Sequence, residues 1–84
     1  MNYKLNFERL KKIENPLKIE QAYKYLKYIA KIVAPNDAVV WYYYKFLASK
    51  MKDENSLKTI EKEFNFLVNQ NMEWKTKLAS LNLQ

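Results

Sequence analysis

Ser49, Ser56 and Ser80 carry hydroxyl groups that a hydrolase or a transferase could use as nucleophiles. A serine nucleophile needs a neighbouring base, and the chain contains neither a histidine to serve as one nor a cysteine to replace the serine. Glycine is also absent, which excludes the phosphate-binding loop, the dinucleotide fingerprint and the nucleophile elbow, because each needs backbone that glycine provides. We therefore expect no enzymatic activity, no catalytic residue and no cofactor.

Metal binding would have to rest on carboxylates alone, because histidine and cysteine are both missing. The nine acidic residues comprise seven glutamates and two aspartates, Asp37 and Asp53. Neither aspartate lies in an Asp-rich loop of the kind that wraps a calcium ion. The sequence therefore predicts no metal site.

Lysine side chains form the next set of candidates, because a chain with a formal net charge of +6 attracts phosphate groups. Lys24, Lys27 and Lys31 recur at helical spacing, and Lys52 is a fourth candidate for phosphate contacts. Recognition of specific bases depends largely on arginine side chains that form two hydrogen bonds with one base, and Arg9 is the single arginine of the chain. Nucleic-acid binding without base specificity is therefore one hypothesis, and a solvated helix face is the alternative explanation of the same lysines.

Aromatic residues indicate a different kind of site, a contact with another protein. Phe66 lies more than about 90° from the apolar stripe of its predicted helix, among polar residues. Trp41 and Tyr42 lie at the edge of another predicted helix, near Lys45. These four residues are the candidates for partner binding, since aromatic side chains often anchor interfaces. The alternatives are that Trp41 packs in the core with its indole N–H bonded locally, and that the first helix covers Phe66.

The elements that carry these residues are predicted to be helices, because glycine is absent and no segment alternates strictly between apolar and polar residues. Asn15 is placed to cap a helix that begins at Pro16, and Asn36-Asp37 is placed to supply a cap and a first-turn negative charge for the helix after Pro35. The expected helices cover about residues 6–14, 16–34, 37–52 and 56–82. We expect an all-α fold, a compact four-helix domain over the whole chain, with a central apolar third helix and a long C-terminal helix.

The last predicted helix shows a heptad-like pattern. Its seam positions recur at alternating spacings of three and four residues, at Leu57, Ile60, Phe64, Leu67, Asn71, Trp74, Leu78 and Leu81. Such a seam fits either a core helix of a monomer or a homodimer through residues 57–81. Residues 69–71 favour helix weakly, so a break there, with Asn71 capping a short final helix, is the alternative to the single helix that we expect.

The first functional hypothesis is a small interaction protein that binds and modulates a larger host or viral protein complex, for instance as an inhibitor. Lysine outnumbers arginine 14 to 1, a skew of AT-rich genomes that favours a low-GC bacterium, or a phage or plasmid of one, as the source. Nucleic-acid binding is the alternative hypothesis. An immunity-type protein that acts at a membrane receptor is the third.

A membrane span is not expected. The most apolar stretch, residues 25–48, contains four charged side chains and is far from the roughly 20 apolar residues that a span needs. Residues 1–15 lack the order of basic, apolar and small residues that marks a secretory signal. We expect a cytoplasmic protein, located in the host cell if a phage encodes it.

Overall fold

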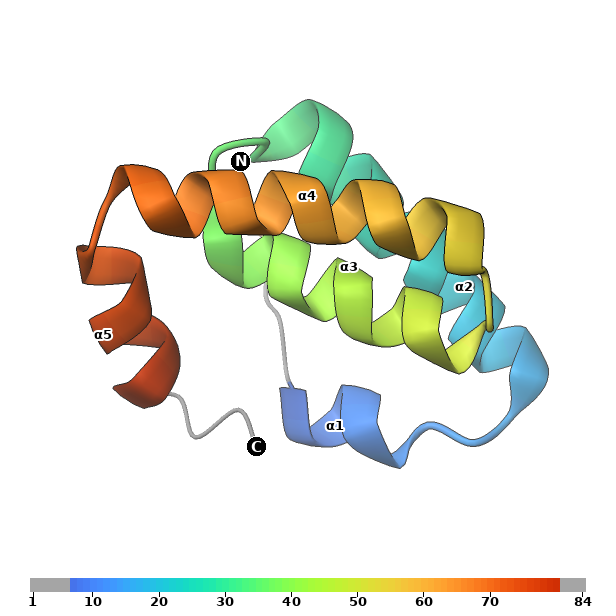
Figure 1. Ribbon diagram of the computed structural model, residues 1–84. Coiled ribbons are helices and arrows are strands. Elements are labelled where there is room, and N and C mark those ends of the chain that lie inside the picture. Colours follow the sequence, from blue (N-terminus) through green and yellow to red (C-terminus); the bar gives the residue numbers. More distant parts are fainter. Residues whose placement is uncertain (1–6, 81–84) are drawn as a thin grey trace.

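The computed structural model describes residues 7–80, and these residues form helices without a strand (Figure 1). The helices are α1 (Phe7–Lys12), α2 (Pro16–Tyr28), the π-helical turn η1 (Ile29–Val33), α3 (Ala38–Lys50), α4 (Glu54–Gln70) and α5 (Glu73–Ser80). The all-α fold predicted from the sequence is confirmed.

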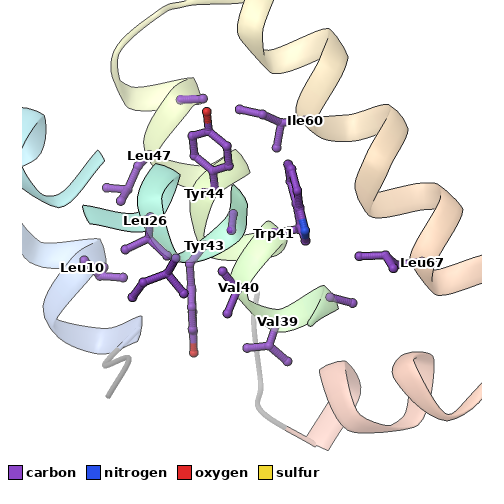
Figure 2. Close-up of a cluster of buried hydrophobic side chains, with 14 of the residues drawn as sticks. Leu10, Leu26, Val39, Val40, Trp41, Tyr43, Tyr44, Leu47, Ile60 and Leu67 are labelled. Atoms are coloured by element: carbon purple, nitrogen blue, oxygen red, sulfur yellow. The ribbon is translucent and has the colours of Figure 1, made fainter. Parts of the chain in front are cut away.

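α3 is the central helix, as its apolar sequence predicts. It contacts α2 and α4, which lie along different sides of it (Figure 1). Its buried residues are Ala38, Val39, Val40, Trp41, Tyr43, Tyr44, Leu47 and Ala48. Leu26 of α2 and Ile60 of α4 point into this cluster and are almost fully buried (Figure 2). The core is therefore built around α3, and α2 and α4 each contribute one apolar face to it.

Side-chain caps begin α2 and α3 where the sequence predicts them. The Asn15 side-chain oxygen accepts hydrogen bonds from the backbone N–H groups of Leu17 and Lys18, at 2.9 and 3.4 Å. The Asp37 carboxylate accepts one from the N–H of Val39 at 2.9 Å. Both caps satisfy N–H groups that have no carbonyl partner in the first turn of a helix.

The corner between α3 and α4 uses a left-handed residue that is not glycine. Lys52 has a φ of 57°, and its N–H donates to the Ser49 carbonyl at 3.2 Å. The Asp53 N–H donates to the Ala48 carbonyl at 3.3 Å, which completes a Schellman motif. Glycine usually takes the left-handed position, and Lys52 takes it here because the chain has no glycine. Asp53 then caps α4, which begins before the predicted start at residue 56.

The predicted C-terminal helix is two helices in the structure, which corrects the single helix expected over residues 56–82. α4 ends at Gln70, and the Asn71 side-chain oxygen accepts a hydrogen bond from the Glu73 N–H at 2.9 Å, at the start of α5. An asparagine that bonds its own neighbouring backbone competes with helix continuation. α5 contacts both α4 and α3.

α1 is held in place by a lysine of α3. The Lys50 ammonium group donates hydrogen bonds to the carbonyl oxygens of Leu10, Lys11 and Ile13, at 3.4, 2.9 and 3.0 Å. Leu10 is buried in the core (Figure 2). α1 and α4 lie on different sides of α3 (Figure 1). The alternative in which the first helix covers Phe66 on the C-terminal helix is therefore wrong.

α2 continues into a single π-helical turn before the chain reverses at Pro35. The Ala34 N–H donates to the Ile29 carbonyl at 2.8 Å, five residues back instead of four. Ile29 and Ala30 are buried in this turn, whereas Ile32 points outward and is exposed. The predicted helix 16–34 therefore forms, with a wider last turn.

Candidate functional site

The lysines considered for phosphate contacts are all exposed, and three of them lie on α2 and the turn η1 that continues it. Lys24 and Lys27 lie on α2, Lys31 lies on η1, and Lys52 lies in the α3–α4 corner. The Lys24 ammonium pairs with the Glu20 carboxylate at 3.3 Å, and both side chains remain exposed. An exposed pair of this kind contributes little to stability. The structure therefore brings Lys24, Lys27 and Lys31 together on the solvent side of α2 and η1.

Trp41 is not available to a partner, which corrects its choice as a binding residue. Its side chain is only 7% exposed, and its indole N–H donates to the Pro35 carbonyl at 2.9 Å. Tyr42 is half-buried, with its ring centroid 5.9 Å from that of Phe64. Lys45 is half-buried as well, with its Nζ 5.5 Å from the Phe64 centroid. Tyr42 and Lys45 thus come together over α4, in a contact that helps to join α3 to α4.

Phe66 is the aromatic candidate that the structure leaves on the surface. Its side chain is 55% exposed on α4. The apolar positions of the same helix turn inward, with Ile60, Leu67 and Val68 buried. Phe66 is therefore separate from the cluster of Tyr42 and Lys45 and remains a candidate for partner contact.

Replacing Phe66 by serine is expected to lower the free energy of unfolding by at most about 1 kcal/mol, because an exposed ring leaves no core cavity behind. The matched control is Phe64→Ser, which removes a half-buried ring from the α3–α4 contact and should cost about 2 kcal/mol or more. Urea denaturation followed by circular dichroism measures both variants. A loss for Phe66→Ser as large as that for Phe64→Ser would place Phe66 in the core.

The heptad seam of the last predicted helix is occupied within the chain itself. The core cluster includes or packs against Leu57, Ile60, Phe64, Leu67, Trp74 and Leu78. Asn71, the polar seam position, is exposed and caps α5, and Leu81 lies outside the described residues. A homodimer through residues 57–81 would therefore have to displace the contacts of α4 and α5 with α3, so the structure offers this hypothesis no unoccupied seam.

An exposed apolar stripe on α2 and η1 was not predicted from the sequence. Four large side chains form it, and we call them the α2 stripe: Leu17, Tyr25, Tyr28 and Ile32. Their exposed fractions are 69%, 48%, 50% and 67%. With the exposed Gln21 they follow spacings of four, four, three and four residues, which is the signal that could have revealed them. The opposite face of α2, which carries Leu26, is the one that packs in the core.

The stripe is narrow and has basic edges. At about 100° per residue, Leu17, Tyr28 and Tyr25 fall within an arc of roughly 80°. Lys24 and Lys31 follow on one edge of this arc. Lys18 follows on the other edge, and Lys27 lies farther round on the side of Lys24. The face therefore combines apolar side chains at its centre with lysines along both sides.

Comparison of the chain with protein-family models, with curated proteins and with solved structures gives no match in any of the three. The candidate surfaces therefore rest on the geometry of residues 7–80.

Tyr44 is a buried ionisable group of α3 that contacts α2. Burial raises the pKa of Tyr44, and a hydrogen bond with Tyr23 of α2 raises it further. Their ring centroids are 5.4 Å apart. Hydrogen bonds from Ser56 lower the pKa of Asp53. A hydrogen bond with Tyr23 and the positive charge of Lys27, both on α2, lower it as well. Tyr23 therefore links α2 to α3 and to the start of α4.

The stability of the protein is expected to fall as the pH rises above about 10. The pKa of Tyr44 lies higher in the folded chain than in an unfolded one, so between these values the unfolded state loses a proton that the folded state keeps. The contribution of Tyr44 to the free energy of unfolding is complete below the pKa of tyrosine in the unfolded chain. It is lost as the pH rises toward the pKa of Tyr44 in the folded chain. Urea midpoints measured from about pH 8 to 11 should fall less steeply in Tyr44→Phe than in the wild type. Parallel profiles would contradict the burial of this hydroxyl.

Pockets and metal-binding clusters do not add a further candidate. A shallow pocket of about 140 Å³ is lined by Asn71, Glu73, Trp74 and Lys77 at the corner of α4 and α5. This volume is below the roughly 300 Å³ at which small-molecule sites begin. Within the part of the chain that the structure describes, no three acidic side chains gather as metal ligands. None of the described helices has the length and apolar character to cross a membrane.

Proposed function

We propose that this chain is a non-enzymatic protein-binding module that docks on a larger protein complex and modulates it. The observation that carries the proposal is the α2 stripe, four large apolar side chains on one solvent-facing side of a helix. Large apolar patches on a protein surface often mark binding sites, and the four side chains share one face on which Gln21 lies between Leu17 and Tyr25. The core does not need these side chains, because α2 already buries its other face against α3.

The composition of the stripe favours a protein partner. Tyrosine is enriched at protein interfaces because it offers a large apolar surface and a polar end at a low entropic cost. Tyr25 and Tyr28 lie at the middle of the stripe, between Leu17 and Ile32. Phe66 is exposed on a different helix and supplies a second apolar contact for a large partner.

Site-specific cross-linking in cells of the source organism tests this function. A photo-crosslinking phenylalanine analogue replaces Tyr28 in one version of the chain and the exposed Lys58 of α4 in the other. We expect a defined cross-linked protein from position 28, no such product from position 58, and loss of the product when Leu17→Ser and Ile32→Ser are added. Identical products from both positions, or none from position 28, would contradict the proposal.

Nucleic-acid binding is the second candidate, and one observation favours it: Tyr25 and Tyr28 lie beside the exposed Lys24 and Lys31. Lysines with interleaved aromatic rings are typical of single-strand binding surfaces. If three lysines neutralise phosphates, the logarithm of the affinity for an oligothymidine should fall by about 2 for each tenfold rise in salt. Replacing Lys24, Lys27 and Lys31 by glutamine should abolish that binding. An unchanged affinity in the triple variant would exclude these lysines as phosphate contacts.

A further inference from the structure

The dimensions of the α2 stripe fit a single helix. From Leu17 to Ile32 the stripe extends over about 22 Å, or four helical turns. An apolar arc of roughly 80° is narrower than the 100° or more by which a helix faces a core, and it matches the seam of a two-helix contact. With Gln21 as a polar seam position between Leu17 and Tyr25, the spacings of three and four residues are also those of side chains that pack between the turns of a partner helix.

The seam continues from α2 into the π-helical turn η1, which carries the last residue of the stripe, Ile32. Its wider turn keeps Ile29 and Ala30 in the core while Ile32 stays exposed four residues after Tyr28. π-helical turns inside α-helices are frequently found at functional sites. The end of the seam at Ile32 therefore lies on a turn that is anchored in the core by Ile29 and Ala30.

The charges beside the seam determine which helix would bind there. Lys18, Lys24 and Lys31 flank the stripe, and Glu20, which pairs with Lys24 at 3.3 Å, is the single acidic side chain of α2. Charged residues beside a helical seam select the partner and its orientation, because like charges repel and unlike charges attract across the contact. A helix with acidic residues beside its apolar seam complements this edge.

A second copy of the same chain does not fit the face. In an antiparallel pair with Leu17 opposite Ile32, identical edges of the two copies face each other, and Lys24 of one copy would lie near Lys24 of the other. In a parallel pair, the edge with Lys24 and Lys31 would face the edge with Lys18. Both arrangements bring edges that carry lysines together, which is unfavourable at close range.

The two ends of the stripe are aliphatic, which favours a protein helix over a nucleic acid as the partner. Leu17 and Ile32 are the two most exposed members, and their side chains have no aromatic face for a base and no charge for a phosphate. Both are suited to apolar packing against leucine or isoleucine of another helix.

We propose that the α2 stripe pairs along its length with one amphipathic helix of a partner protein, which has apolar residues every three to four positions and Glu or Asp on both sides of them. This inference rests on the proposed function and names the chemistry of the partner at that site. Lys24 and Lys31 select the acidic partner, and the four stripe residues supply the apolar contact.

Two synthetic peptides test the proposal on the full chain. Each has about 21 residues, or three heptads, with leucine at the seam positions, and they carry either glutamate or lysine beside the seam. Fluorescence anisotropy of labelled peptide measures binding at about 50 and 150 mM salt. We expect the Glu peptide to bind at least about tenfold more tightly than the Lys peptide at the lower salt concentration.

Variants of the protein separate the apolar contact from the charges. Tyr28→Ser with Ile32→Ser should weaken binding of the Glu peptide at least about tenfold, whereas Phe66→Ser should leave it unchanged. Lys24→Glu with Lys31→Glu should reverse the preference, so that the Lys peptide binds more tightly than the Glu peptide. All substituted residues are exposed, and circular dichroism verifies that each variant is folded.

Three results would overturn the proposal: equal binding of the two peptides, binding of the Glu peptide that survives loss of the stripe, or failure of the Glu peptide to bind. If an oligothymidine or vesicles containing phosphatidylglycerol bind through the stripe while the Glu peptide does not, the face belongs to nucleic acid or lipid. Cross-linking from position 28 remains an independent test, because it does not depend on partner charge. If a specific cross-link forms but the Glu peptide does not bind, the proposed function stands and the acidic partner helix is rejected. If neither a cross-link nor peptide binding is found, the proposed function and the acidic partner helix are both rejected.

Discussion

Replacing Trp41 by alanine is expected to lower the free energy of unfolding by about 3–5 kcal/mol, the range for removal of a buried aromatic side chain. The indole lies between α3 and α4, and Figure 2 shows it among Tyr44, Ile60 and Leu67. Its ring centroid is 5.6 Å from that of Tyr44. A domain of this length has a total stability of only about 4–12 kcal/mol, so the loss is a large share of it.

Two effects combine in this substitution, and a second variant separates them. Trp41→Ala leaves a cavity, and it also removes the N–H that donates to the Pro35 carbonyl at 2.9 Å. Trp41→Phe keeps most of the ring and loses the hydrogen bond, and should cost about 1–3 kcal/mol. Urea denaturation followed by circular dichroism measures both. A loss below about 1 kcal/mol for Trp41→Ala would place the indole at the surface and restore Trp41 as a binding candidate.

The helices could be predicted because their signals are local. Asn15 and Asp37 cap the turns that directly follow them, and Pro16 occupies a first helical position. The central place of α3 also follows from its own residues, because a helix that is apolar over most of its circumference must be covered on several sides.

The break between α4 and α5 depends on two signals that compete within a few residues. The heptad spacing continues through Asn71 and favours one helix, whereas the Asn71 side chain caps the next turn and favours two. Both patterns are present in the sequence, and the spacing does not reveal their relative strength. The structure shows that the local hydrogen bond prevails, which agrees with the weak helix propensity of asparagine.

The sequence leaves two alternatives for Trp41, a binding residue or a core residue with a locally bonded indole, and it does not predict the α2 stripe, because both features depend on how helices cross. Trp41 lies at an edge of the apolar arc of α3, and the course of α4 over that edge buries it. α2 carries apolar residues on two faces, one with Leu26 and one with Leu17 and Tyr28. Periodicity finds both faces, but only the packing against α3 decides which of them remains exposed.

Replacing Lys50 by methionine is expected to lower the free energy of unfolding by about 2–3 kcal/mol, because hydrogen bonds from a charged donor contribute about 1.5–3 kcal/mol. The last carbonyls of a helix lack partners within the helix, and the Lys50 ammonium group supplies three donors to those at the end of α1. Its positive charge also complements the helix dipole there. Methionine retains most of the aliphatic length and removes the donors and the charge, together with the contact of the ammonium group with the Phe46 ring, whose centroid lies 5.1 Å from Nζ.

The loss of stability in Lys50→Met should appear first in α1, because this helix is too short to be stable by itself. Helices of fewer than about 12 residues are marginal in water without tertiary contacts, and α1 has six residues. Hydrogen exchange of the α1 amides should therefore accelerate in Lys50→Met, while the amides of α3 and α4 change less. Lys58→Met, at an exposed position of α4, is the matched control and should change stability by no more than about 0.5 kcal/mol. Equal stability of the two variants would show that the contact of Lys50 with α1 does not hold that helix, and would favour the buried Leu10 as an attachment of α1 to the core.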